Sequence, residues 1–249
     1  MSEHESWYNQ DEFWELNEPV LFNIQRQSSA VTEVEKIVAL LQLDERARIL
    51  DLCCGIGRHS LEFAQRGFDV VGVDRTTAYI EKARKAASKQ NLNAKFTVTD
   101  MRQYCEPNYF DVIVNLFGSF AYFEDQADDR KVVENMYASL RPGGQFLIET
   151  MGKEILARDF QAKDWAEVGD TLVLSEREIT RNWERINTRW IIIKGGRRSE
   201  FNVSLRSYSA IELSSLLVEC GFPEVSVYGD LEGAAYDRAA KRLVMIGRK

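Results

Sequence analysis

Between residues 46 and about 150, short apolar runs alternate with amphipathic stretches of helical spacing. The predicted strands are residues 47–52, 68–73, 95–99, 110–116 and 145–150, and the predicted helices are residues 57–66, 76–89 and 124–140. Strands that alternate with helices of this length indicate βαβ units, right-handed crossovers and a parallel sheet. The last helix is expected to stop before Arg141-Pro142-Gly143-Gly144, because Pro and Gly both interrupt helices.

The two flanks of this region follow other patterns. Residues 1–45 are predicted to be helical, with Ser28 or Ser29 as an N-cap before an apolar stripe of Val31, Val34, Ile37, Val38 and Leu41. Residues 163–206 alternate with the period of two that is typical of strands, and Gly195-Gly196 indicates a hairpin turn. Helical spacing returns at 209–220, with strands near 225–228 and 243–246.

These patterns predict an α/β fold with a doubly wound, mostly parallel sheet and an antiparallel insertion after its fifth strand. The predicted parts are an N-terminal helical cap at 1–45, a core at 46–151 and 207–249, and a strand-rich insertion at 152–206. A length of 249 residues fits one domain of this class.

The amino-acid composition narrows the range of possible binding partners. The chain has 39 acidic and 32 basic residues, a net charge of −7, so a nucleic-acid substrate is disfavoured without a local basic stripe. No apolar run reaches the ~20 residues of a membrane span, and the acidic, aromatic start is unlike a targeting peptide, so a cytoplasmic location is expected. Four cysteines and two histidines indicate neither a disulfide framework nor a metal site.

The stretch ILDLCCGIGRHS at 49–60 carries the candidate chemistry. Gly55 and Gly57 permit a tight turn between a strand and a helix, where backbone N–H groups and the helix N-terminus meet nucleotide-like cofactors. Asp74 ends the second strand and can accept both hydroxyls of a ribose. Asp100 ends the third strand, where an acid can reach an adenine amino group.

Two cofactors suit this arrangement. A dinucleotide fingerprint requires Gly or Ala where Ser60 stands, and a pyrophosphate is repelled by a carboxylate such as Asp51. A cofactor with a sulfonium, an amino group and no phosphate tolerates these acids. S-adenosylmethionine is therefore favoured, with an NAD(P)-dependent oxidoreductase as the alternative.

Five segments together resemble the class I (Rossmann-like) S-adenosylmethionine-dependent methyltransferases. They are LDLCCGIGRHS at 50–60, GVD at 72–74, TDMR at 99–102, FDVIVNLFGSFAYF at 110–123 and LRPGGQFLIE at 140–149. The resemblance implies a Rossmann-like sheet of seven strands, and S-adenosylhomocysteine as the product. The helical cap and the insertion are similar in layout to a small-molecule subgroup that includes glycine and amino-sugar N-methyltransferases.

The resemblance also implies the cofactor-binding residues. Asp51, Gly55 and Gly57 would hold the methionine portion, Asp74 the ribose, Asp100 with Met101 the adenine, and Asn115 would lie beneath the methionine half. Cys53 stands where the family usually has its first glycine.

Four further residues are cofactor candidates by their place in the chain, with Arg58 and His59 as alternatives to each other. Either Arg58 or His59 is expected to meet the cofactor carboxylate, with a plain helix-surface role as the alternative. Arg75 follows Asp74 directly. Tyr8, in the cap, is expected to close over the cofactor or to hold the cap down by packing.

Tyr122, in the loop after the fourth strand, is the predicted catalytic and substrate-facing residue, because an electron-rich ring attracts a sulfonium and a phenol can orient an acceptor. Arg206 and Tyr208, where the insertion rejoins the core, are predicted to bind substrate. The predicted function is direct in-line methyl transfer to a nitrogen or oxygen of a small molecule, by a monomer or homodimer. A non-catalytic S-adenosylmethionine-binding protein stays open.

Overall fold

The computed structural model describes residues 6–249 and contains two β-sheets. The larger sheet consists of β1 (Arg48–Leu52), β2 (Asp69–Asp74), β3 (Ala94–Val98), β4 (Phe110–Asn115), β5 (Leu140–Thr150), β10 (Glu224–Tyr228) and β11 (Leu243–Arg248). Its order is β10-β11-β5-β4-β1-β2-β3, and β11 runs antiparallel to both neighbours while the other pairs are parallel. The predicted doubly wound, mostly parallel sheet of seven strands is confirmed.

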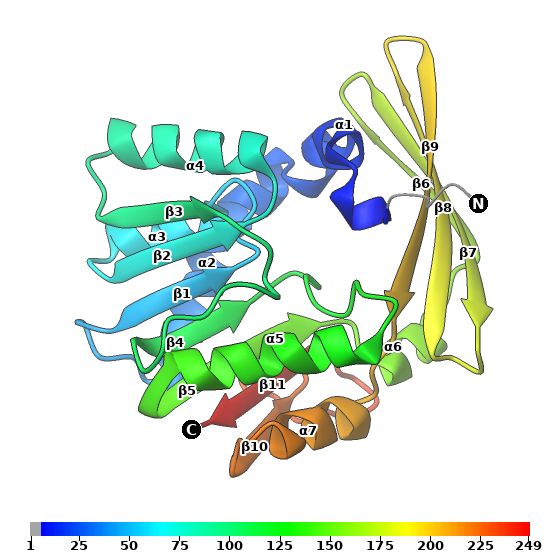
Figure 1. The fold of residues 1–249 in the computed structure, drawn as a ribbon. Coiled ribbons are helices and arrows are strands. Elements are labelled where there is room, and N and C mark those ends of the chain that lie inside the picture. Colours follow the sequence, from blue (N-terminus) through cyan, green and yellow to red (C-terminus); the bar gives the residue numbers. More distant parts are fainter. Residues whose placement is uncertain (1–5) are drawn as a thin grey trace.

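Helices cover both faces of this sheet (Figure 1). One face carries α2 (Ile24–Leu41), α3 (Arg58–Gln65) and α4 (Thr77–Lys89), and the other carries α5 (Gln126–Ser139) and α7 (Ala210–Glu219). In β1, Ile49 packs toward α2 and α3, whereas Leu50 and Leu52 pack toward α5. Burial on both faces explains why β1 is apolar at successive positions.

The smaller sheet is antiparallel and consists of β6 (Lys163–Val168), β7 (Thr171–Thr180), β8 (Arg185–Lys194) and β9 (Arg197–Arg206), reached from β5 through α6 (Lys153–Arg158). Between the two sheets lie η1 (Trp7–Asn9) and α1 (Asp11–Leu21) (Figure 1). Phe13 of α1 packs against Val173, Ile192 and Phe201. The N-terminal segment therefore covers one face of the smaller sheet.

The predicted cap of the second N-terminal helix is wrong. α2 begins at Ile24, and the N-cap is Asn23, whose side chain accepts a hydrogen bond from Arg26 N at 2.9 Å. Ser28 and Ser29 lie inside the helix, where their hydroxyls donate to carbonyls of the preceding turn. Val31 is half exposed and not part of the buried stripe.

The boundary between α5 and β5 also differs from the prediction. α5 ends at Ser139, before Arg141-Pro142-Gly143-Gly144, but β5 begins directly at Leu140 and includes these residues. Backbone bonds between this segment and Lys249 support the extended conformation. The short helix α6 had no signal in the sequence pattern.

Asp129 of α5 ties the end of the smaller sheet to the core. Its side chain is fully buried and accepts hydrogen bonds from Tyr208 Oη at 2.9 Å and from Arg206 Nε at 3.2 Å. Arg206 also forms an ion pair with Glu184. Both predicted substrate residues therefore anchor the insertion, and neither lines the pocket described below.

This tether generates a prediction about pH. Burial raises the pKa of Asp129 from 3.8 to about 6, against the opposing effects of Tyr208 and Arg206. Between these values the folded state binds a proton that the unfolded state has lost, so the contribution of Asp129 to the free energy of unfolding falls as pH rises from about 4 to about 6. We expect Asp129→Asn to remove this component, measured by urea unfolding across that range. Glu134→Gln, at an exposed position of α5, is the control. Parallel pH curves for the wild type and Asp129→Asn would contradict the assignment.

Candidate active site

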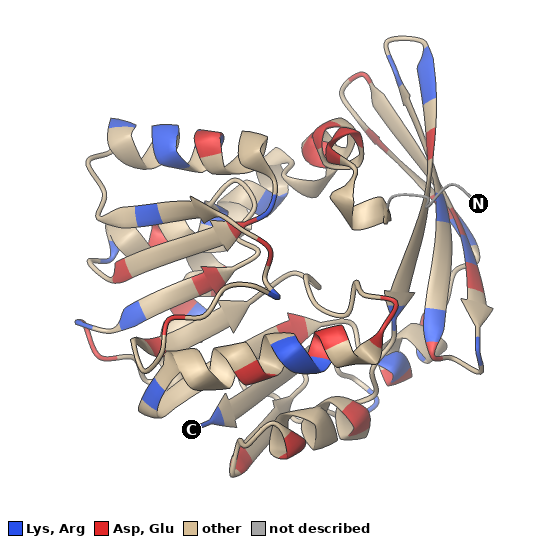
Figure 2. Ribbon diagram, viewed as in Figure 1, with Lys and Arg blue, Asp and Glu red and all other residues tan. Residues whose placement is uncertain are grey.

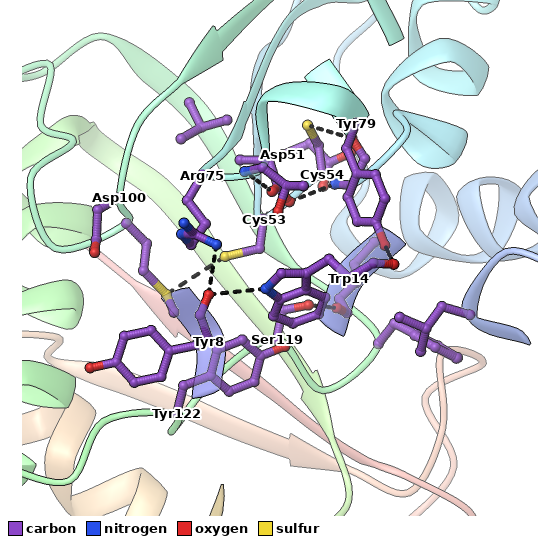
Figure 3. A pocket seen from close by; sticks show the side chains of 18 of the residues that line it. Tyr8, Trp14, Asp51, Cys53, Cys54, Arg75, Tyr79, Asp100, Ser119 and Tyr122 are labelled. Atoms are coloured by element: carbon purple, nitrogen blue, oxygen red, sulfur yellow. Dashed lines mark hydrogen bonds between the residues drawn. The ribbon is translucent and has the colours of Figure 1, made fainter. Parts of the chain in front are cut away.

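A pocket lies at the carboxyl edge of the parallel strands, between the larger sheet and the N-terminal helices. Its cavity volume is about 140 Å³, and the pocket is partly open to solvent. The predicted site residues that line it are Tyr8, Asp51, Cys53, Gly55, Arg58, Asp74, Arg75, Asp100, Met101 and Tyr122. Figure 3 shows most of them from close by.

The β1–α3 turn depends on left-handed backbone conformations. Gly55 has φ of +56°, and a Cβ there would lie 2.6 Å from the Phe22 ring, so glycine is required. Gly57 has φ of +83° and begins α3, where a Cβ would press on Ala83. Gly57 thus serves helix packing and does not line the pocket. Cys53 also has positive φ, and its Sγ lies 3.6 Å from Met101 Sδ.

Two carboxylates hold this turn, of which Asp51 is buried and Asp74 is half-buried. Asp74 accepts backbone hydrogen bonds from Gly55 at 2.9 Å and from Thr76 at 2.8 Å. Asp51 accepts a 2.5 Å bond from Ser60 Oγ, which explains a serine at the position where dinucleotide sites need Gly or Ala. Burial raises the pKa of both acids. A carboxylate has about four acceptor positions, so each acid keeps capacity for a ligand donor.

Asp100 and Met101 lie at the end of β3. Burial opposes charge on Asp100, but hydrogen bonds from Arg102 outweigh it and hold the pKa of this carboxyl below its usual value. The shortest of these bonds, Arg102 Nη2 to Asp100 Oδ2, is 2.6 Å. The Arg102 guanidinium also lies 4.4 Å from the centre of the Phe123 ring. Asp100 therefore lies at the pocket and is already bonded to Arg102.

Arg58 and His59 are held by Glu33 of α2. Glu33 Oε2 lies 2.6 Å from Arg58 Nη1 and 2.7 Å from His59 Nε2. Burial opposes charge on Glu33, yet the bond from His59 and the charge of Arg58 outweigh it and lower its pKa to about 2. Glu33 was not among the residues predicted from the sequence. An acid next to Val34 and Ile37, inside the apolar stripe of a helix, was the available signal.

Arg75 fastens the N-terminal segment over the pocket. Its guanidinium donates to Tyr8 O at 2.7 Å and to Asn9 O at 3.2 Å, and it forms an ion pair with Asp11. Trp14 Nε1 donates to the same Tyr8 carbonyl at 3.0 Å. Arg75 thereby positions Tyr8 at the pocket wall.

The loop after β4 also contributes residues to the wall of the pocket. Asn115 Nδ2 donates to Leu52 O at 3.1 Å and Ser119 O at 3.3 Å, which ties the loop to β1. Its Oδ1 is buried and has no hydrogen-bond partner in the described part of the chain, and Asn115 does not line the pocket. Tyr122 packs beside the rings of Trp7 and Trp14, at centroid distances of 4.9 and 6.1 Å. Burial raises the pKa of Tyr122, so it stays a phenol.

Among residues 6–249, no group of three or more His, Cys, Asp or Glu side chains is arranged to hold a metal ion. No helix in this range is long and apolar enough to cross a bilayer.

Comparisons with known proteins agree with this geometry. Residues 49–144 match the family model of the methyltransferase domain. Glycine/sarcosine N-methyltransferase of Aphanothece halophytica is 24% identical over 216 residues, which cover 85% of this chain and 79% of that protein.

Solved structures share the fold over nearly the whole chain. An S-adenosylmethionine-dependent methyltransferase from Clostridium acetobutylicum has a TM-score of 0.77 at 14% identity, covering 96% of this chain and 98% of its own. An amino pentose methyltransferase of Micromonospora echinaspora, solved with its S-adenosylmethionine bound, has a TM-score of 0.65 at 22% identity and covers 99% and 100%.

The Glu33 contacts predict a stability effect. Glu33→Gln removes the charge that faces Arg58 and His59, and we expect it to lower the free energy of unfolding by about 1–3 kcal/mol. Glu35→Gln, at an exposed position of the same helix, should change it by less than about 0.5 kcal/mol. Chemical denaturation of both variants at neutral pH measures the difference. Equal stabilities of the two variants would show that Glu33 is dispensable for the α2–α3 contact.

Proposed function

We propose that this chain, a class I S-adenosylmethionine-dependent methyltransferase, transfers the methyl group to a nitrogen or oxygen of a small molecule. The observation that carries the proposal is a pocket lined both by acids from the ends of β1, β2 and β3 and by aromatic rings. Relatives that methylate glycine, sarcosine and an amino pentose support a small acceptor.

The residues at the β1–α3 turn fit S-adenosylmethionine. Gly55 lets the turn adopt its left-handed conformation against Phe22, and Asp51 and Asp74 present acceptors to an ammonium and to ribose hydroxyls. Asn115 Oδ1 is a further buried acceptor beneath the turn, with no partner in the described residues. Three acids around one pocket also disfavour a pyrophosphate, and hence the NAD(P)-dependent alternative.

Bound S-adenosylmethionine supplies a methyl group on a positively charged sulfur that is its own leaving group. The chain's residues provide orientation and a dry site. Asp74 and Asp51 orient the ligand from the turn, while Tyr8 and Trp14 cover it from the N-terminal segment. Tyr122 presents its ring and its phenol from the loop after β4, where it can orient the acceptor.

The same proposal assigns roles to the parts of the chain. Residues 1–45 form a helical cap, of which 1–5 lie outside the described residues. The core at 46–151 and 207–249 binds the methyl donor, and the insertion at 152–206 supports the cap. A nucleic-acid acceptor is disfavoured because basic and acidic residues are interspersed on the elements around the pocket (Figure 2).

Cofactor binding tests the proposal first. We expect calorimetry to show binding of S-adenosylmethionine and S-adenosylhomocysteine, weakened at least about tenfold by Asp74→Asn, because this change removes a charged acceptor. Asp69→Asn, at the opposite end of β2, is the matched control and should bind like the wild type. Binding of NAD in place of both sulfur compounds would overturn the assignment.

Tyr122 has a distinct expected signature. Tyr122→Phe removes the phenol and keeps the ring, so we expect kcat to fall about tenfold while the dissociation constant of S-adenosylmethionine changes less than about twofold. Tyr104→Phe, whose lost hydroxyl bonds Glu106 outside the pocket, is the control. Unchanged turnover of Tyr122→Phe on the physiological acceptor would remove Tyr122 from the reaction.

A further inference from the structure

The smaller sheet is covered on one face only. Val173, Ile192 and Phe201 pack toward α1, which lies on that side of the sheet (Figure 1). The residues that alternate with them point to the opposite face, here called the outer face, because successive side chains of a strand point to opposite sides. Among the described residues, no side chain of the outer face belongs to a hydrophobic cluster.

An apolar patch occupies the half of the outer face nearer the β6–β7 and β8–β9 turns. Its members lie in register on three neighbouring strands and are Trp165, Leu172, Leu174, Ile191 and Ile193. Trp165 is 67% exposed, and the other four side chains are only partly buried. A contiguous apolar surface that the chain itself leaves in water is typical of an interaction site.

Charged residues of both signs border this apolar patch. Glu167 of β6 and Arg198 of β9 end the row that contains Leu172, at the two edges of the sheet. Both are exposed, and Glu167 has no ion-pair partner among the described residues. Glu176 and Arg189 form a 2.9 Å ion pair beside the patch. Acids and bases that alternate in this way disfavour a nucleic acid or an anionic membrane, which would need a basic surface.

A second copy of the chain is complementary to this surface. A twofold axis parallel to the strands, between β7 and β8, places β7 of one copy over β8 of the other and β6 over β9. Apolar side chains then meet apolar side chains in both rows of the patch. Glu167 of each copy meets Arg198 of the other, and Glu176 meets Arg189. Each contact forms twice, as an isologous interface requires.

We propose that the outer face of the smaller sheet is the interface of a homodimer, in which two antiparallel sheets pack face to face. Sheets that pack in this way interdigitate their side chains at a separation of about 10 Å. The inner face keeps its contact with α1, so each copy retains its own pocket.

Charge reversal tests the interface. The self-association of the full chain would be measured by sedimentation between about 1 and 100 µM, where we expect a dimer to form. Glu167→Arg or Arg198→Glu alone places like charges together at two symmetric contacts, so we expect the dissociation constant of the dimer to rise about tenfold. The double variant exchanges the charges and should return to within about threefold of the wild type. A double variant that dimerises no better than either single variant would overturn the proposal.

A substitution in the apolar patch tests its centre. Leu174→Arg should weaken the dimer at least about a hundredfold, because it buries a charge without a partner. Ile211→Arg, at a position of α7 that is 77% exposed, is the matched control and should dimerise like the wild type. Circular dichroism checks that both variants fold, and the charge-reversal series decides the matter if Leu174→Arg does not.

Two results contradict this interface. One is a wild-type chain that stays monomeric at about 100 µM. The other is a dimer that a folded Leu174→Arg variant leaves intact, as expected for pairing through the edge strands β6 or β9.

Discussion

The hydrogen bonds from the backbone of Gly55 and Thr76 to the half-buried carboxylate of Asp74 are the interaction on which the pocket depends. A carboxylate that is partly withdrawn from water needs donors to compensate for the lost hydration, and two backbone amides meet that need here. The same bonds fix the position of the β1–α3 turn relative to β2. The hydrogen bond from Ser60 to Asp51 holds the turn at a second point. The turn is thereby shaped before any ligand binds, which lowers the entropic cost of binding.

Contacts with the N-terminal segment complete the pocket at the edge of the larger sheet. Phe22 occupies the space beside Gly55, Glu33 holds the first turn of α3, and Arg75 draws Tyr8 toward the pocket. Phe13 of α1 packs on the smaller sheet. The insertion therefore bears on the pocket indirectly, by supporting the helix that covers it. Arg206 and Tyr208 bind Asp129 and thereby anchor the insertion to the core.

Two kinds of side chain line the pocket. Acids with backbone or side-chain donors surround the β1–α3 turn, and aromatic rings come from the N-terminal segment, from α4 and from the loop after β4. The existing ion pairs at Arg58, Arg75 and Arg102 leave their charges compensated.

The order of strands and helices in the core was predictable from the sequence because periodicity is a local property. The turn at Gly55, the acid at Asp74 and the hairpin at Gly195-Gly196 follow from short segments, and the structure has them where the pattern predicted. The roles of Glu33, Phe22 and Arg75 were not predictable, since each contacts residues between 25 and 67 positions away. Arg206 illustrates the same limit, because its buried partner Asp129 is 77 positions away. Local sequence patterns determined the fold class and the location of the β1–α3 turn. Long-range packing decided which side chains reach the pocket, because the partners of a side chain depend on how distant elements pack together.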